Sequence, residues 1–191
     1  VRAYDNSKRE QKSAETARRI LAAAEAFVRE KPLGELTLAD VAERSECTVQ
    51  TIIRKYGGKE GLLEAVSEEV RARIIKQRSQ MLEGDIDAAM DNLLEHYETE
   101  GDLVLRLLAQ ESTSDFAAEM AAEGRVFHRG WVESTFGPVC GPLDSTQIDA
   151  LVVATDLFTW RLLRRDLARS LAETKAVLIQ LIDTSKKKVD C

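Results

Sequence analysis

The side chains best suited to chemistry gather in one short stretch of the sequence, residues 48–56. Helical spacing places its polar members on one face, and these are Gln50, Thr51, Arg54 and Lys55. Its apolar members recur at intervals of three and four residues on the opposite face, and these are Val49, Ile52, Ile53 and Tyr56. Amide, hydroxyl and guanidinium groups in this arrangement favour recognition by hydrogen bonding rather than the breaking of covalent bonds.

Such a polar face suits the edges of nucleic-acid bases. Gln50 can pair with adenine through two hydrogen bonds, and Arg54 can pair with guanine or a phosphate. The side chains of Thr48, Thr51 and Lys55 can hold the sugar-phosphate backbone. At the start of the preceding helix, Thr37 offers its hydroxyl and nearby N–H groups to a further phosphate.

The elements around this stretch form a recognisable supersecondary pattern. Residues 16–30 have the apolar period of an amphipathic helix, and Thr37-Leu38-Ala39-Asp40 has the form of a capping box that opens a helix of about two turns. A break at 45–47 precedes Thr48, a good N-cap, and Gly57-Gly58 ends the second short helix. Two short helices covered by a longer one are typical of a helix-turn-helix.

The rest of the sequence predicts only helices. A long helix is expected from Lys59 to about Met81, and further segments at 86–100, 103–112, 115–135, 145–168 and 171–187. The loop 136–142 contains two prolines and is expected to interrupt the chain. We therefore predict an all-α protein of about nine helices, with a flexible arm at 1–13, a helix-turn-helix domain at 14–62 and a larger C-terminal domain at 63–191.

Charge differs between the two predicted domains. The whole chain has a net charge of −6, but residues up to Leu62 contain 12 Lys and Arg against 10 Asp and Glu, and the remainder contains 15 against 23. A mildly basic head can approach phosphates that an acidic body repels. Ordinary variation in composition would explain the difference equally well.

Several other classes of protein are not favoured. No apolar run reaches the roughly 18 residues that a membrane helix needs, and the polar N-terminus has no signal peptide pattern, so a cytoplasmic location is expected. The three cysteines are far apart, and neither His96 nor His128 has metal-ligand spacing. No catalytic motif is visible, so we expect no enzyme activity, no catalytic residue, no metal and no cofactor.

Residues 20–66 resemble the DNA-binding domain of the TetR family of transcriptional regulators. The matching features are Ala23-Ala24, Phe27, Thr37, Asp40-Val41-Ala42, Thr48, Tyr56 and Lys59-Glu60-x-Leu62-Leu63. The resemblance implies that the helix at 48–56 enters the major groove of operator DNA. It implies DNA-contact roles for Thr37, Thr48, Gln50, Thr51, Lys55 and Lys59, and more loosely for Val49 and Arg54.

Two positions depart from the family pattern. Glu46 stands in the turn where the family often has glycine, so the turn must accept a side chain and a negative charge near DNA. Ile53 stands where the family most often has a phosphate-binding tyrosine, so one phosphate contact is expected to be lost, with Arg54 or Lys55 as its replacement.

The resemblance also implies a homodimer formed through the last two helices, and a small hydrophobic or amphipathic ligand in the C-terminal domain. Expected dimer-interface residues are Leu151, Thr155, Phe158, Leu162, Val177, Leu178, Leu181 and Ile182. Expected walls of the ligand pocket are Tyr97, Phe127, His128, Trp131 and Phe158. The alternative for each of these residues is a place in an ordinary core, and for the pocket residues that alternative is the more common one.

Three functions remain open on the sequence alone. The first is a ligand-responsive repressor that acts as a homodimer on a pseudo-palindromic operator. The second is a helical ligand-binding or protein-interaction module that has lost DNA binding, at which Glu46 and Ile53 hint. The third is an all-α enzyme with a site around His96 or His128. The sequence identifies neither the operator nor the ligand.

Overall fold

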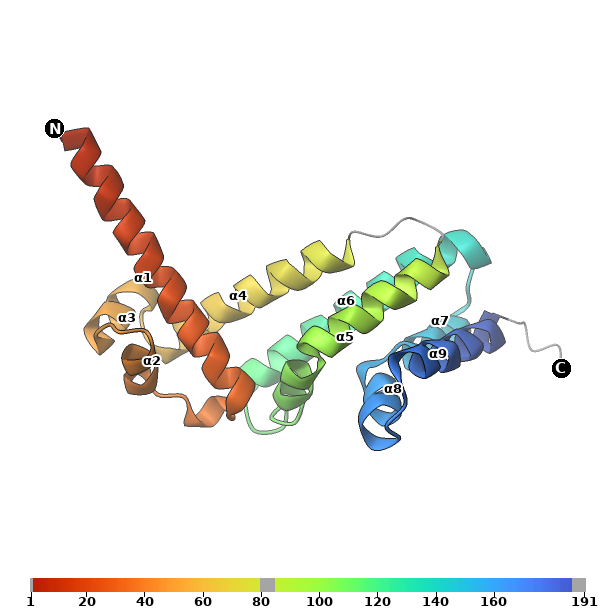
Figure 1. Ribbon diagram of the computed structural model, residues 1–191. Coiled ribbons are helices and arrows are strands. Elements are labelled where there is room, and N and C mark those ends of the chain that lie inside the picture. The colour runs from red at the N-terminus through yellow and green to blue at the C-terminus, as the bar shows by residue number, and fades with distance from the viewer. Residues whose placement is uncertain (1, 80–84, 187–191) are drawn as a thin grey trace. The chain divides into compact units, whose positions relative to one another are not determined.

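A computed structural model of the chain describes residues 2–79 and 85–186, with side chains from 7 to 185. Within these residues every regular element is a helix, which confirms the all-α prediction (Figure 1). None of the described helices has both the length and the apolar character needed to cross a membrane. Contacts divide the chain into two compact units, Val1–Arg73 and Ile74–Cys191.

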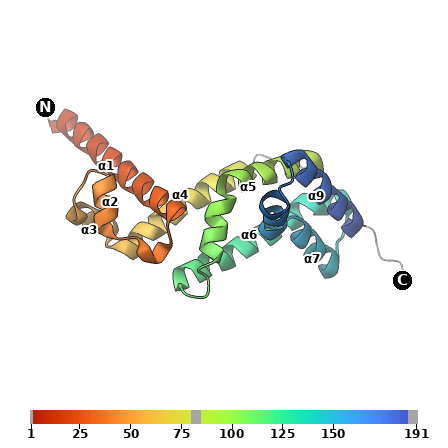
Figure 2. The same ribbon diagram turned by 60° about the horizontal axis from the view of Figure 1, so that its bottom comes forward.

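The N-terminal unit is a helix-turn-helix packed on a long helix. Its elements are α1 (Arg2–Glu30), the 3-10 turn η1 (Leu33–Glu35), α2 (Leu38–Arg44), α3 (Val49–Tyr56) and the first part of α4 (Lys59–Arg78). In Figure 2, α2 and α3 lie together beside α1. Fully buried side chains from each of the four helices make the core, and they include Ile20, Val41, Ile52 and Leu62. This core fixes the orientation of α3.

The N-terminus differs from the expectation of a flexible arm. Helix α1 begins at Arg2 and therefore includes nearly all of the segment 1–13. The segment has no apolar period, and its side chains from residue 7 to residue 13 are exposed, but starting a helix is the costly step and extending one is not. The buried turns from Ile20 onward nucleate α1, and the Arg, Lys, Glu and Gln residues before them propagate it.

The boundary between the units also lies later than the expected end of the first domain at Leu62. Helix α4 contributes residues to both units, and the division falls inside it, after Arg73. Leu62, Leu63 and Val66 are buried in the N-terminal unit, which explains why the first turns of α4 belong there. Met81, the expected end of this helix, lies outside the described residues.

The C-terminal unit is a helical bundle around one hydrophobic core. Its elements after α4 are α5 (Ile86–Leu108), α6 (Asp115–Cys140), α7 (Ser145–Ala154), α8 (Leu157–Arg161), the π-helical turn η2 (Leu162–Asp166) and α9 (Leu171–Lys186). Helices α5 and α6 run side by side, and α7 packs against α6 and α9 (Figures 1 and 2). Leu94, Phe136, Leu151, Trp160 and Ile182 are among the buried core side chains.

Three predicted breaks in this unit fall elsewhere. Helix α5 continues through the expected gap at 101–102, because Gly101 lies directly under the ring of Trp160 and is held in the core. Helix α6 continues through Pro138, which lies in its last turn, where a missing N–H removes only one backbone hydrogen bond. The expected single helix at 145–168 is divided, because Asp156 caps a new helix by accepting from the N–H of Phe158 at 2.7 Å.

Side-chain caps are present at four helix starts, and two of them, Thr37 and Thr48, confirm the predicted capping residues. The hydroxyls of Thr37 and Thr48 accept from the N–H groups of Asp40 and Thr51, each at 3.2 Å. Asp144 forms a full capping box with Gln147, and the carboxylate of Glu173 accepts from the N–H and hydroxyl of Ser170. Such local hydrogen bonds depend on neighbours in sequence, which is why the sequence predicts them well.

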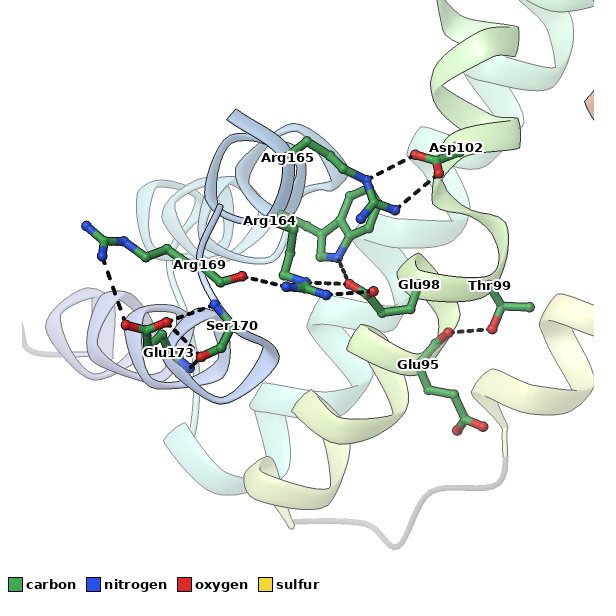
Figure 3. A network of polar contacts seen from close by, with 10 residues as sticks. Glu95, Glu98, Thr99, Asp102, Arg164, Arg165, Arg169, Ser170 and Glu173 are labelled. Carbon is green, nitrogen blue, oxygen red and sulfur yellow. Dashed lines mark hydrogen bonds and ion pairs between the residues drawn. The ribbon is translucent and has the colours of Figure 1, made fainter. Parts of the chain in front are cut away.

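A polar network attaches η2 to α5 (Figure 3). Arg164 donates to both carboxylate oxygens of Glu98, at 2.6 and 2.9 Å, and the indole N–H of Trp160 donates to the same carboxylate at 2.9 Å. Arg165 pairs with Asp102 one turn further along α5. These bonds hold the π-helical turn against α5 in a defined register.

Candidate nucleic-acid interface and a groove in the C-terminal unit

Helix α3 is anchored at its start, on one face and at its end. Ile52 is fully buried, and the hydroxyl of Tyr56 donates to the carbonyl of Ala17 on α1 at 3.4 Å. Gly57 ends the helix in the left-handed conformation at φ 81°, where its N–H donates to the carbonyl of Ile53. Because these contacts attach one face of α3 to the core, the opposite, polar face of the helix lies at the surface.

Two of the predicted DNA-contact residues are exposed and have no hydrogen-bond or ion-pair partner among the described residues. Gln50 and Arg54 both lie on the surface, and neither forms a hydrogen bond or ion pair with any other described residue. Two side chains four residues apart lie one helical turn from each other on the same face. They present an amide and a guanidinium, the groups that read adenine and guanine in a major groove.

The other polar candidates already have partners inside the unit. The hydroxyls of Thr48 and Thr51 lie 2.9 Å apart, and that of Thr37 donates to Asp40. The ammonium group of Lys55 donates to the carbonyl and hydroxyl of Ser13 on α1, at 3.1 and 2.9 Å. These contacts fix the positions of the threonine and lysine side chains around the exposed face of α3.

Lys59 is tethered in a similar way. At the start of α4, its ammonium group donates to the carbonyl of Gly34 in η1 at 3.2 Å. An ammonium has three donor positions, so both Lys55 and Lys59 retain capacity for a phosphate oxygen.

The apolar face of α3 is less buried than its period predicts. Val49 is 36% exposed and Ile53 is 39% exposed, whereas Ile52 between them is fully buried. A helix of only two turns contacts its core along a narrow strip, so apolar residues at the edges of the stripe stay at the surface. Val49 and Ile53 therefore border the polar face and offer methyl groups beside it.

Glu46 occupies the turn in the conformation that glycine would favour. Its φ is +51°, and its side chain is exposed. The guanidinium of Arg19 on α1 donates to its carboxylate at 3.1 Å. The negative charge in the turn is therefore paired within the chain. Sequence reasoning identified Glu46 but missed Arg19, because the two are 27 positions apart.

The predicted pocket residues divide into two groups. Phe127 and Trp131 line an open groove of about 370 Å³ in the C-terminal unit, together with Ile75, Arg78, Ser79, Val126, Gly130 and Ser134.

Tyr97 is buried, and its hydroxyl donates to the carbonyl of Thr155 at 2.8 Å. His128 stacks on Trp131 and contacts the hydroxyl of Thr155 at 3.1 Å. Phe158 does not line the groove and is 53% exposed.

Sequence reasoning missed the most unusual residue of this region, Arg78. It is 5% exposed, and its guanidinium lies 4.1 Å from the ring of Trp131. Burial lowers the pKa of Arg78 to about 10, so the side chain remains a cation at neutral pH. An arginine near the end of a helix is ordinarily exposed, so its sequence position carries no signal of burial.

The two histidines beside Arg78 are neutral. Burial lowers the pKa of His96 to about 3 and that of His128 to about 4, and the charge of Arg78 lowers both further. Burial also raises the pKa of Tyr97. Of Arg78, His96 and His128, only Arg78 is therefore charged at neutral pH.

The predicted dimer-interface residues also divide. Leu151, Thr155, Leu178 and Ile182 are buried within one chain and fill its core, so they have no surface to offer a second copy. Phe158, Leu162 and Leu181 are exposed, at 53%, 49% and 41%, and Val177 is half-buried. The helical period identified the apolar positions of these last helices. It could not distinguish the positions that pack into the chain's own core from those that stay exposed.

Comparisons with known proteins agree with this geometry. Residues 20–66 match the model of bacterial regulatory proteins of the tetR family. No curated protein gives a significant match to the chain.

Solved structures share the fold over most of the chain. A transcriptional regulator from Rhodococcus sp. Rha1 is 16% identical, with a TM-score of 0.69, over 88% of this chain and 94% of that one. A protein described as a transcriptional regulator from Pseudomonas aeruginosa PAO1 is 12% identical, with a TM-score of 0.67, over 93% and 91%. A protein described as a TetR-family transcriptional regulator from Rhodococcus sp. is 17% identical, with a TM-score of 0.66, over 91% and 100%. The helix-turn-helix segment at residues 20–66 thus matches the tetR family of bacterial regulatory proteins, and the fold of the chain is similar to that of these solved structures.

Proposed function

We propose that this chain is a DNA-binding transcriptional regulator that acts as a homodimer and represses transcription until a small molecule releases it. The observation that carries the DNA-binding part is the geometry of α3. Ile52 anchors one face, and Gln50 and Arg54 are exposed without partners on the other. A helix held in this way can enter a major groove and present donors and acceptors to base edges.

The surrounding residues supply the rest of the interface in this proposal. Lys55 and Lys59 bind phosphates on either side of the groove, and their contacts to Ser13 and Gly34 preset their positions. Val49 and Ile53 contact thymine methyl groups or sugars, which suits their partly exposed aliphatic side chains. Thr37 and Thr48 place two helix N-termini near phosphates.

Selection of bound fragments from genomic or random DNA by the purified chain tests this function. A palindromic consensus and an affinity that falls steeply with salt concentration are expected, because each phosphate contact releases counterions. Within that site, Gln50→Ala and Arg54→Ala should each weaken binding by about 1–3 kcal/mol and relax base preference at one position. Arg125→Ala, at an exposed arginine of the C-terminal unit, is the control and should leave the affinity unchanged.

The opposite outcome supports the alternative of a module that no longer binds DNA. In that case no fragment is enriched, and Gln50→Ala and Arg54→Ala behave as the parent chain does. The pairing of Glu46 with Arg19 argues against this alternative, because it offsets the charge that would repel a phosphate.

Dimerisation through the C-terminal unit is the second part of the proposal. Large apolar side chains remain exposed along α7 to α9, and these are Val153, Phe158, Leu162, Leu167, Leu171 and Leu181. Exposed apolar side chains in such number mark association surfaces. A second copy of this chain is the proposed occupant, because a two-fold dimer presents two copies of α3 to half-sites about 34 Å apart, one turn of DNA.

Release by a ligand is the third part. Helix α4 begins next to α3 and ends at Arg78, on the wall of the groove. A ligand bound in the groove needs only a modest preference for one state of this helix to change DNA affinity, typically about 1–3 kcal/mol of coupling. Titrating a ligand into the protein–DNA complex measures this coupling directly.

A further inference from the structure

The groove of the C-terminal unit has a charged residue without a counterion on its wall. Arg78 lines the groove, is 5% exposed, and forms no ion pair with any carboxylate in the part of the chain that the structure describes. Burying an isolated cation is unfavourable by several kcal/mol unless an anion or hydrogen-bond acceptors compensate it. An unsatisfied buried cation of this kind calls for an explanation other than stability, such as a bound ligand.

The unsatisfied atoms of Arg78 form a binding edge. Its Nε and Nη2 atoms are shielded from solvent and have no hydrogen-bond partner. These two nitrogens lie on the same side of the guanidinium, and both donate in the side-on pairing of arginine with a carboxylate. The indole N–H of Trp131, whose ring lies against Arg78, is a third buried donor without a partner.

The surroundings of this edge are apolar or neutral. Ile75, Val126, Phe127 and Trp131 supply the apolar wall of the groove. His96 and His128 are neutral at physiological pH, since burial holds the pKa of each far below 6.5. One full positive charge thus faces a groove of about 370 Å³, near the lower end of the size range of small-molecule sites.

From these observations we infer that the groove binds a small organic monoanion, with its carboxylate paired side-on to Nε and Nη2 of Arg78 and its apolar body against Phe127 and Trp131. One cation balances one negative charge, which favours a monocarboxylate over a phosphate ester of higher charge. An apolar body explains why aromatic and aliphatic carbons, not further cations, line the rest of the groove.

Entry of the carboxylate requires a local rearrangement of the wall. The ring of Phe127 is 38% exposed, and its centroid lies 5.9 Å from the guanidinium carbon of Arg78. A partly exposed side chain changes rotamer at little cost, so Phe127 can move aside and open a path to the buried edge. Naming this anion as the effector rests on the proposed regulatory function, but its binding does not.

Calorimetric titration of the full chain with three carboxylates, benzoate, 1-naphthoate and octanoate, tests the inference. Each acid is compared with its primary amide, which keeps the shape and removes the charge. At least one carboxylate should bind tenfold or more tightly than its amide. If every acid and its amide bind equally, or if none binds, the inference is overturned.

Three variants test the role of Arg78 itself. Arg78→Met should abolish the preference for the carboxylate and raise the Tm of the free protein, because it removes a buried cation that no carboxylate neutralises. Arg78→Lys keeps the charge without the two-nitrogen edge and should weaken binding at least tenfold; it also provides the readout if Arg78→Met does not fold. Arg125→Gln, at an exposed arginine on α6, should bind as the parent does. Unchanged binding in Arg78→Lys and Arg78→Met overturns the proposal.

DNA binding separates this inference from the proposed function. Arg78→Met should bind the selected operator fragment as the parent does but should no longer be released by the carboxylate. If the carboxylate binds at Arg78 and the chain binds no DNA, the regulator function fails and the groove assignment stands. If DNA binding is intact and no carboxylate binds, only the groove assignment fails.

Discussion

At the scale of single residues, this protein retains several side chains in unfavourable positions. Glu46 has a positive φ, Arg78 is a buried cation, and the buried His96 and the half-buried His128 are both uncharged. All of these residues lie in the turn before α3 or close to the groove. Departures of this kind from the rules of local stability are candidates for a functional role.

The conformation of Glu46 predicts an unusual order of stabilities. Glu46→Gly should be more stable than Glu46→Ala by about 1 kcal/mol, because alanine keeps the Cβ that a left-handed backbone disfavours and glycine does not. Both variants lose the pair with Arg19, so that contribution cancels. Urea unfolding measures the difference.

Glu43 on α2 provides the matched control. It is exposed inside a helix, where alanine is favoured over glycine by about 0.5–1 kcal/mol. The order at Glu43 should therefore be the reverse of the order at Glu46. The same order at both positions would contradict the assigned turn conformation.

The lowered pKa values of His96 and His128 predict a loss of stability in mild acid. Their pKa values of about 3 and 4 lie below the unfolded value near 6.5, so between these values the unfolded chain binds more protons than the folded chain. The free energy of unfolding should be fully developed above pH 6.5 and should fall as the pH drops. At pH 5, 1.5 units below the unfolded pKa, each histidine should account for about 2 kcal/mol of this loss.

Chemical unfolding at pH 7 and pH 5 measures the effect. His96→Gln removes one titrating group and should reduce the loss by about 2 kcal/mol relative to the parent chain. An identical pH dependence in parent and variant would mean that His96 is not buried as a neutral side chain.

At the scale of elements, close approach between helices decides where they start and stop. Gly101 allows the ring of Trp160 to lie directly on α5: a Cβ built at position 101 would lie 2.8 Å from Cζ3 and 2.9 Å from Cη2 of that ring. The indole is held in place by its hydrogen bond to Glu98, which also pairs with Arg164 (Figure 3). The ring therefore cannot move aside without breaking this network.

Gly101→Ala should consequently destabilise the C-terminal unit. Overpacking of this kind is typically unfavourable by about 1–3 kcal/mol, which outweighs the gain of up to about 1 kcal/mol that alanine brings to a helix. Gly124→Ala on α6 is the control, since its Cβ would meet no atom within 4 Å and should stabilise the helix. Thermal unfolding distinguishes the two, and a higher Tm for both variants would contradict the packing described here.

At the scale of the whole molecule, the two units have different proposed roles, and the role of the N-terminal unit depends on the C-terminal unit. The N-terminal unit positions α3, and the C-terminal unit carries the groove and the exposed apolar side chains of α7 to α9. In the proposed function, DNA recognition by two copies of α3 gains affinity only when the C-terminal units hold the copies together.

Disrupting the proposed dimer surface should therefore weaken DNA binding without touching α3. Leu162→Glu and Leu181→Glu each place a charge where an apolar side chain is exposed, and each should shift the chain toward monomer in sedimentation velocity. Operator affinity should fall at least tenfold in the same variants. Val126→Glu, at an exposed valine of the groove, should remain a dimer. Dimers in all three would exclude these leucines from the interface.

The sequence by itself determined the helical content, the helix-turn-helix and most of its caps. Periodicity and capping depend on residues within one or two turns, so Thr37, Thr48 and the polar face of α3 could be identified without coordinates.

Tertiary structure decided what depends on residues distant in sequence. It paired Arg19 with Glu46, continued α5 and α6 past their expected ends, and sent Leu151 and Ile182 into the core while leaving Leu162 and Leu181 at the surface. It also buried Arg78 against Trp131. A helical period shows that a face is apolar, but which neighbour covers that face, and which charge is left without a partner, follows from packing between segments far apart in the chain.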